Sequence, residues 1–296
     1  MITRKIILKF RFINKLSRKF AKKILLAFIN LDDFFLKLRI FIFTLIIGKK
    51  SKIGKALFDL KQNGVAVIPN FYSEAEITKI KEECLKQLDK LPFDDLSEGK
   101  RQTNLHLDND LRIEKIRGSI KVKKLNVINQ FFKKIGRDFK TNLITLIYTL
   151  SSSKPFLVYS VTHDGSFNHK SVPEPCTKEM IAGEPHLDTF SHELRFIVPL
   201  EEVTKENGPT ICYKGSMHLK EIKEIHLNML LETFKFKPDE GGSHFVNKDK
   251  TKFLEEKLGK TYLTGNKGDL ILLDLKTAHY ASNLKNGQRH ILWYYY

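Results

Sequence analysis

The chain has 296 residues, of which 42% are hydrophobic and 29% charged, and it carries three cysteines and a formal net charge of +17. This length fits one large domain, and the odd number of cysteines, without metal-ligand spacing, argues against a disulfide framework and for a reducing compartment. No Pro/Gly/Ser-rich linker, internal repeat or low-complexity tract interrupts the sequence, which excludes a repeat architecture.

Most of the positive charge lies near the N-terminus. The first 55 residues carry fifteen Lys and Arg against two Asp, a net of +13, which leaves +4 for the other 241 residues. Apolar residues recur in steps of three and four over residues 6–42, which predicts one long amphipathic helix or two shorter ones. A basic amphipathic helix is typical of segments that lie in the headgroup region of an anionic membrane. We therefore expect residues 1–50 to be a basic helical extension of a domain at 51–296, with residues 1–47 able to contact an anionic membrane surface.

Other interpretations of this segment stay open. Residues 24–47 are long enough to span a bilayer, but Asp32, Asp33, Lys37 and Arg39 would lie near its centre, each at a cost of roughly 2.5–3.5 kcal/mol. The residue order of a cleaved signal peptide is absent. The helix could instead pack on the domain with its lysines in solvent, or bind nucleic acid, although no recognised module supports a nucleic-acid partner. The expected location is the cytoplasm, peripheral on the inner face of a membrane.

Helical patterns precede strand patterns in the rest of the chain. Ser73 and Glu76 form a capping box before apolar residues at helical spacing, and residues 125–148 continue the helical character. After Pro155 the pattern changes to short apolar runs, and strands are expected at 156–161, 185–190, 194–200, 210–213, 268–275 and 289–296. Two long excursions, 164–183 and 220–264, are expected to be lids or substrate walls. This order predicts an α+β fold, a double-stranded β-helix (a cupin-like jelly roll) backed by helices.

A metal site is predicted from the spacing of polar residues around these strands. His186 and Asp188 are two residues apart, so on an extended segment their side chains point to the same side. His279, after the run at 268–275, can supply a third ligand from a distant strand. Two histidines and one carboxylate on one face of iron(II) leave positions for a bidentate co-substrate and dioxygen. Arg289 opens the last apolar run, and its guanidinium can clamp a carboxylate through two parallel hydrogen bonds.

The remaining histidines fit a ligand role less well. His106 and Asp108 share the spacing of the predicted ligands but lie in a polar stretch that is expected to be a surface loop. His163 and Asp164 are adjacent, so on a strand they would face opposite ways. Structural or supporting positions are expected for three others, namely His192, His218 and His290.

Taken in order, these motifs resemble the phytanoyl-CoA dioxygenase family of iron(II)/2-oxoglutarate oxygenases. The resemblance covers roughly residues 56–296 and rests on the segment 63–73, His186-x-Asp188, Asn207-Gly208-Pro209, Gly215-Ser216-Met217-His218, Gly268-Asp269, His279 and Arg289. It implies a hydroxylase that uses iron(II), 2-oxoglutarate and O2. It also implies that His186, Asp188 and His279 bind iron while Arg289 holds the far carboxylate of 2-oxoglutarate.

Two positions depart from the family pattern. Relatives often place a serine two residues after the distal histidine to assist the co-substrate carboxylate. That position is Ala281, so Ser282 is the candidate instead, and the turn before His218 contains one extra residue. The carboxylate of Asp188 favours hydroxylation, because related halogenases replace it with a small residue.

The resemblance does not define the substrate, since the family accepts acyl-CoA esters, amino-acid derivatives, alkylphosphonates and secondary metabolites. The basic N-terminal segment favours a small-molecule or lipid-like substrate presented at a membrane surface. A soluble acyl thioester or phosphonate is the second candidate. A different class of function is also open, namely a catalytically inactive, membrane-associated binding protein with a vestigial metal site. The sequence defines no oligomeric state.

Overall fold

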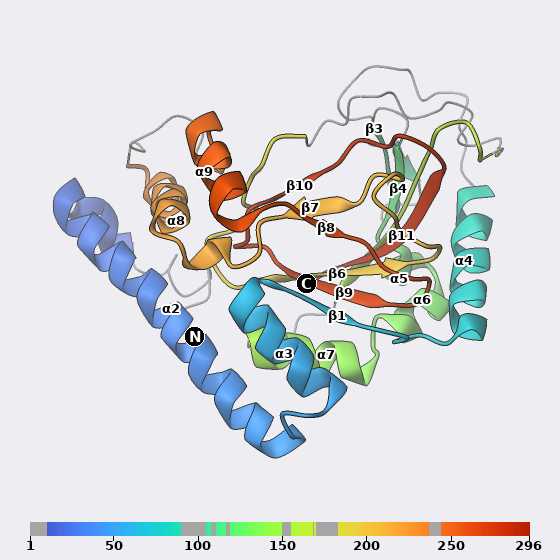
Figure 1. Cartoon of the computed structure of the whole chain (residues 1–296), viewed down its shortest axis with the longest axis horizontal. Helices are drawn as coiled ribbons and strands as arrows, with labels where there is room; N and C mark the ends of the chain where they lie inside the picture. Colours follow the sequence, from blue (N-terminus) through green and yellow to red (C-terminus); the bar gives the residue numbers. More distant parts are fainter. Residues whose placement is uncertain are drawn as a thin grey trace.

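The computed structural model describes residues 11–89, 105–107, 111–116, 119–149, 155–167, 169, 183–236 and 244–296 (Figure 1). Within these ranges two antiparallel sheets pack together, and helices cover the outer face of the larger sheet. This is the α+β jelly roll backed by helices that the sequence predicts.

The larger sheet has eight strands and the smaller sheet has three, and all neighbours are antiparallel. In spatial order the larger sheet contains β1 (Val65–Ile68), β9 (Leu270–Asp274), β6 (Leu194–Pro199), β11 (Gln288–Tyr295), β5 (Phe156–His163), β4 (Ser119–Lys123), β3 (Leu111–Ile116) and β2 (Leu105–Leu107). The smaller sheet contains β10 (His279–Ala281), β7 (Thr210–Cys212) and β8 (Thr261–Leu263).

Helices precede the sheets and also interrupt them. The N-terminal part of the chain forms η1 (Arg11–Lys15), α2 (Arg18–Ile47), α3 (Lys52–Asn63) and α4 (Glu74–Asp89). The predicted capping box opens α4, because Glu76 accepts a 2.8 Å hydrogen bond from the Ser73 amide. The later helices are α5 (Leu125–Ile128), α6 (Gln130–Ile135), α7 (Phe139–Thr149), η2 (Ser216–His218), α8 (Lys220–Thr233) and α9 (Lys248–Leu258).

The core has two layers because side chains alternate along the strands. On β9, Leu270 and Leu272 face the covering helices, whereas Ile271 and Leu273 face the smaller sheet. The same alternation on β11 directs one set of residues toward Cys212 of β7, in the space between the sheets. The inner layer therefore forms the wall from which a site between the sheets is built.

The structure corrects several predicted elements. Residues 185–190 form no strand, because within this segment only His186 makes bridge pairs before the chain turns at Thr189–Ser191. The helical stretch at 125–148 divides into α5, α6 and α7, since Asn129 and Asp138 begin new helices by capping them. The excursion at 220–264 contains α8, α9 and β8. Most of the excursion at 164–183 lies outside the described residues.

The predicted surface loop around His106 is also wrong. His106 lies on β2, and β2, β3 and β4 extend the larger sheet beyond β5. Apolar residues do alternate with polar ones here, as in the sequence SIKVK of β4, but the high charge of the stretch favours the interpretation as a loop. Asp108 lies outside the described residues.

The N-terminal helix α2 packs along one side of the molecule against α3, α7 and α8 (Figure 1). Ala21, Leu25 and Ile29 contact residues of α8, while Leu36 and Ile40 join the core beneath the larger sheet. Among the described helices, none combines the length and the hydropathy needed to cross a membrane. The division of the chain at residue 50 stays a prediction.

Candidate metal centre

The structure brings His186, Asp188 and His279 together at one end of the barrel. His186 and His279 exchange backbone hydrogen bonds, each amide donating to the carbonyl of the other at 3.0 Å. The Asp188 amide donates to the carbonyl of Leu275, just after β9, at 3.2 Å. Two segments almost 90 residues apart in sequence therefore hold the three side chains side by side.

The three side chains offer one ligand atom each within 4.8 Å of one another. Asp188 lies between the imidazoles, with Oδ1 3.5 Å from Nε2 of His186 and Oδ2 3.5 Å from Nε2 of His279. Ligands at right angles around an ion, at metal–ligand distances of about 2.1 Å, lie about 3 Å apart. The ligand atoms of Asp188 and the two histidines would therefore need to move closer together to bind one metal ion on the same side.

Backbone contacts determine the orientation and tautomer of both imidazoles. Nδ1 of His186 donates to the carbonyl of Glu184 at 2.9 Å, and Nδ1 of His279 donates to the carbonyl of Thr277 at 2.8 Å. Because a carbonyl can only accept, both Nδ1 atoms carry the proton in the neutral rings, and both Nε2 lone pairs face Asp188. Nε2 of His279 is buried and makes no hydrogen bond. This is the arrangement of a metal-binding histidine held by an outer partner.

The electrostatics also suit a metal ion. Burial and the neighbouring His279 lower the pKa of His186 below its ordinary value, which keeps the ring neutral at pH 7. Burial alone would raise the pKa of Asp188, but the positive charge of Arg195, which donates a hydrogen bond to this carboxylate, helps to hold it well below its usual range. The site therefore presents two imidazoles and one carboxylate, a donor set that fits a divalent first-row metal such as iron(II).

Arg195, at the start of β6, is a residue that the sequence reasoning missed. Its Nη2 donates to Oδ2 of Asp188 at 2.7 Å, and its guanidinium lies 4.6 Å from the ring centre of Tyr295. The guanidinium also lies 5.8 Å from the ring centre of Trp293. The signal in the sequence is a single arginine inside the apolar run 194–200, where a charge needs a buried partner.

Arg289 lies on the inner layer of the barrel but farther along it. It is 5% exposed and pairs with Thr162 of β5 near the opposite end of β11 from Tyr295. Residues i and i+2 share a face, so Arg289 shares the face of Ile291 and Trp293, which belong to the core between the sheets. The predicted arginine thus points into the barrel interior.

Ser282 is not brought to the cluster. Its hydroxyl donates to the carbonyl of Pro209 at 2.7 Å, which ties β10 to the turn before β7. Ser282 lines a surface hollow together with Tyr280 and Tyr262. Residues i and i+2 share a face of a strand, so Ala281, and not Ser282, shares the face of His279. A co-substrate contact by Ser282 stays a prediction.

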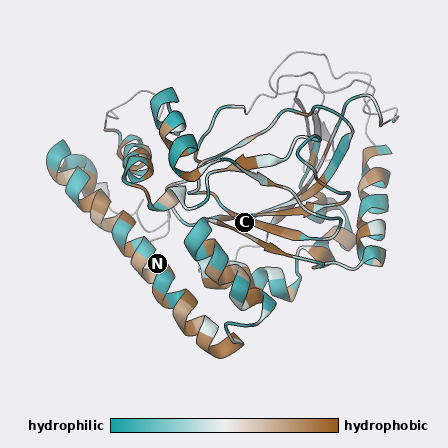
Figure 2. Cartoon of the chain, viewed as in Figure 1, coloured by the Kyte–Doolittle hydropathy of each residue, from teal (hydrophilic) through white to brown (hydrophobic). Residues whose placement is uncertain are grey.

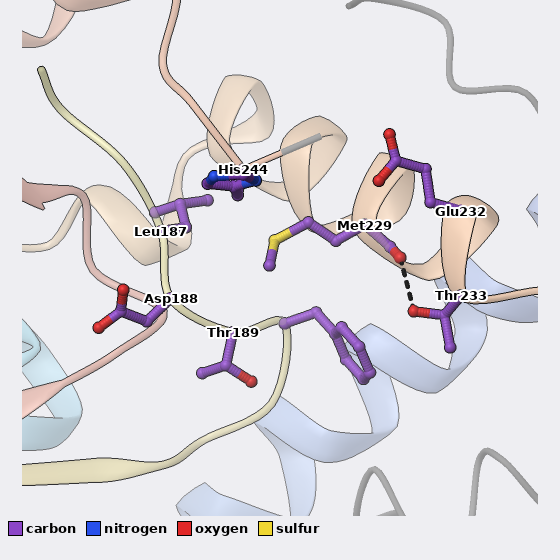
Figure 3. Close-up of a pocket in the computed structure, with 8 residues that line it drawn as sticks. Leu187, Asp188, Thr189, Met229, Glu232, Thr233 and His244 are labelled. Atoms are coloured by element: carbon purple, nitrogen blue, oxygen red, sulfur yellow. Dashed lines mark hydrogen bonds between the residues drawn. The ribbon is translucent and has the colours of Figure 1, made fainter. Parts of the chain in front are cut away.

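A cavity of about 500 Å³ opens beside Asp188 (Figure 3). Leu187, Asp188 and Thr189 line one side of it, and Met229, Glu232 and Thr233 of α8 line the facing side (Figure 3). His244, whose carbonyl accepts from the Leu187 amide at 2.8 Å, completes the wall. The excursion between β7 and β8 therefore forms a wall of the space next to the candidate metal ligand.

The three histidines that were expected to be structural or supporting, His192, His218 and His290, make contacts outside the candidate metal site. His192 bridges two carboxylates, with Nε2 3.0 Å from Asp33 and Nδ1 2.6 Å from Asp274. Nε2 of His218 donates to the carbonyl of Lys61 at 3.0 Å. His290 contacts the hydroxyl of Tyr159 through Nδ1 at 2.6 Å, and burial lowers the pKa of His290 to about 3.

A comparison with models of protein families finds no match for this sequence, and a comparison with curated proteins finds none either. Among solved structures, the chain is similar to the epimerase SnoN in complex with Fe3+, alpha ketoglutarate and nogalamycin RO, with 13% identity, 82% of each chain covered and a TM-score of 0.52. It is also similar to EctD from S. alaskensis with bound Fe, with 13% identity, 80% of this chain and 73% of that chain covered, and a TM-score of 0.54. At this identity the similarity establishes a shared fold, which confirms the predicted jelly roll. The resemblance to the phytanoyl-CoA dioxygenase family remains a prediction from the motifs.

Proposed function

We propose that this protein is an iron(II)- and 2-oxoglutarate-dependent oxygenase that hydroxylates an unactivated C–H bond of a small-molecule or lipid-like substrate. One observation carries the proposal: His186 and His279 direct their Nε2 atoms at the carboxylate of Asp188, and each ring is held through Nδ1 by a backbone carbonyl. Nε2 of His279 is buried and makes no hydrogen bond. Buried polar atoms normally have a hydrogen-bond partner, so this atom is better explained as a metal ligand than as part of a purely structural cluster.

The choice of cofactors is supported by the donor set and by the fold. Two imidazoles and one carboxylate are the protein ligands of non-haem iron oxygenases. SnoN, which shares the fold, is described in complex with Fe3+ and alpha ketoglutarate, and EctD is described with bound Fe. When bound, iron with 2-oxoglutarate and O2 supplies the oxidation: substrate R–H becomes R–OH, while 2-oxoglutarate loses CO2 to give succinate.

The protein residues position and shelter the reactants in this scheme. His186, Asp188 and His279 would hold the iron, and Arg195 would keep the Asp188 carboxylate oriented through its 2.7 Å hydrogen bond. Arg289 would pair with the far carboxylate of 2-oxoglutarate, since a buried guanidinium binds a carboxylate with two parallel hydrogen bonds. Its apolar neighbours Ile291 and Trp293 would exclude water from that ion pair.

The cavity beside Asp188 is the proposed place of the substrate. Its walls combine apolar Leu187, Phe190 and Met229 with polar Thr189 and Glu232. Such a lining suits a molecule with a hydrocarbon part and a polar part. The basic amphipathic pattern of residues 1–47 supports presentation of that substrate at the inner face of a membrane.

The proposal is tested by turnover without the native substrate. Protein supplied with iron(II), 2-oxoglutarate and O2 is expected to release succinate slowly, and Asp188→Ala should abolish this release. Asp249→Ala, at an exposed position in the first turn of α9, is the matched control and should release succinate like the wild type. Bound iron without succinate release would favour the inactive binding protein instead.

A further inference from the structure

The outward face of α2 is apolar over its C-terminal half. Figure 2 shows hydrophobic colour over much of this half of the helix. Eight large apolar side chains there are between 37% and 73% exposed, namely Leu31, Phe34, Phe35, Leu38, Phe41, Ile42, Leu45 and Ile46. Among residues 31–47, all of which the structure describes, Lys37 is the only exposed charge. At a rise of 1.5 Å per residue this apolar face is about 22 Å long.

Apart from Lys37, the charged residues of the same half face inward, toward the domain. Oδ1 of Asp33 accepts a 2.7 Å hydrogen bond from Lys276, which is buried, and lies 3.0 Å from His192. Arg39 donates to the carbonyls of Ile147 and Tyr148, at the C-terminal end of α7, at 3.0 and 2.7 Å. Those carbonyls are acceptors that α7 itself cannot satisfy.

This distribution departs from that of an ordinary surface helix, which turns its apolar stripe to the core and its charges to water. The charges that make a membrane-spanning helix unfavourable are the groups that attach α2 to the domain. The exposed face is left with side chains that water solvates poorly, and apolar patches of this kind mark contacts with a membrane or a protein.

Basic residues flank the apolar face at both ends. Arg18, Lys19 and Lys23 are exposed in the first turns of α2, and Lys49, Lys50, Lys52 and Lys55 are exposed beyond its end. Each basic residue near an anionic bilayer contributes about 1 kcal/mol of attraction. A second copy of the chain is a poorer occupant, because a symmetric contact through this face would place basic ends of the two copies against each other or beside each other.

A basic hollow adjoins the same face. It has a volume of about 630 Å³, and its lining includes the exposed ring of Phe34 together with Lys37, Lys61 and Lys223. Asp33 is the carboxylate in this lining, and it is already paired with Lys223 at 3.1 Å and with Lys276. The hollow therefore offers cationic groups to a phosphate beside the N-terminal part of the apolar face.

From these observations we propose that the outward face of α2, from Leu31 to Ile46, docks on a bilayer that contains anionic phospholipids. The apolar side chains enter the boundary between headgroups and acyl chains, and the flanking lysines and the basic hollow contact lipid phosphates. The helix lies in the plane of the membrane surface, attached to the domain through Asp33 and Arg39.

Docking in this way places the candidate substrate cavity next to the membrane. The N-terminal half of α2 packs against Leu230 and Leu231 of α8 and against Phe234, just beyond its end. Helix α8 also supplies Met229, Glu232 and Thr233 to the wall of the cavity beside Asp188. A single helix thus separates α2 from the cavity. This step rests on the proposed oxygenase function and identifies its substrate class as an amphiphile drawn from the bilayer.

The docking surface is tested by sedimentation of the full-length protein with phosphatidylcholine vesicles, with and without phosphatidylserine. The wild type should sediment with the vesicles that contain phosphatidylserine. The triple variant Phe34→Ser/Phe41→Ser/Leu45→Ser should lower the partition coefficient at least about tenfold, because three exposed apolar side chains no longer enter the bilayer. Val127→Ser/Phe139→Ser, at exposed positions on α5 and α7, is the matched control and should sediment like the wild type.

Two outcomes would overturn the docking surface. One is equal sedimentation of the triple variant and the wild type. The other is a wild type that ignores anionic vesicles and forms a dimer that the triple variant loses, which would assign the face to a second copy. Circular dichroism checks that each variant folds. Succinate release in the absence of vesicles tests the oxygenase separately, so either proposal can fail while the other stands.

Discussion

Replacement of Asp33 by asparagine tests whether α2 is an integral part of the fold. Asp33, Asp274, His192 and Lys276 form a buried cluster in which two carboxylates face two basic side chains. Burial alone would raise the pKa of Asp33, but hydrogen bonding with His192 and the charge of Lys276 hold it far below its usual range. Asp33→Asn leaves Lys276 buried without this counter-charge.

The expected loss of unfolding free energy is about 3 kcal/mol. Removal of one partner from a buried ion pair costs about 3–5 kcal/mol, and the lower value applies because the Asp33 side chain is 12% exposed. Such a loss is a large part of the 5–15 kcal/mol by which a typical domain is stable. Urea unfolding should show a lower midpoint with an unchanged slope.

Two variants accompany this measurement. Asp59→Asn, on the exposed side of α3, should leave the midpoint unchanged. Asp33→Asn/Lys276→Met should be more stable than Asp33→Asn alone, because removal of both charges leaves no uncompensated ion. A loss below about 1 kcal/mol for Asp33→Asn would refute the reasoning and would make α2 a detachable extension.

Two further predictions concern the same corner of the molecule. Although burial opposes it, Asp274 and Asp33 raise the pKa of His192, so its contribution to stability is complete below about pH 6.5 and is lost as the pH rises through the raised pKa. Urea titrations of the wild type should show unfolding free energy falling above pH 6.5, and His192→Asn should remove this fall; the same pH dependence in both proteins would contradict the reasoning. Gly64 and Gly215 have similar left-handed φ angles of 70° and 75°, but a Cβ on Gly64 would overlap the Thr277 hydroxyl whereas one on Gly215 meets ordinary contacts. Gly64→Ala should therefore lower the unfolding free energy by about 2 kcal/mol more than Gly215→Ala does. It should also weaken iron binding, because the Thr277 carbonyl orients His279. Equal urea midpoints and equal iron affinity for the two variants would show that the close approach of Gly64 to Thr277 is unimportant.

The sequence predicted the parts of the fold that depend on local pattern. The capping box at Ser73 and the strands β5, β6, β9 and β11 lie where apolar runs and turn residues indicate them. The strands β2, β3 and β4 escaped prediction because their many charged residues favour the interpretation as a loop, although apolar and polar residues alternate in β2 and β4. Helix α7 begins anew after a break because Asp138 caps it, a local hydrogen bond that competes with helical periodicity.

The candidate site was predictable only in part, because local spacing reveals some of its residues and contacts between different segments determine the rest. His186, Asp188 and His279 follow a spacing rule that a short motif can carry. The cluster around Asp33 joins residues up to 243 positions apart, which periodicity cannot reveal. Arg195 is only seven positions from Asp188, but the two meet across a turn rather than along one strand. The amphipathic pattern also does not show which side chains of α2 are buried. Asp32 and Asp33 point inward, and the burial of Asp33 depends on partners in other elements.

Anaerobic addition of iron(II) and 2-oxoglutarate tests the central claim most directly. The wild type should develop a weak visible metal-to-ligand charge-transfer band. The band should be lost in Asp188→Ala, which removes a candidate ligand, and weakened in Arg289→Ala, which removes the proposed carboxylate partner. Absence of the band in the wild type, with metal analysis finding no bound iron, would contradict the account and favour a binding protein whose main functional surface is α2.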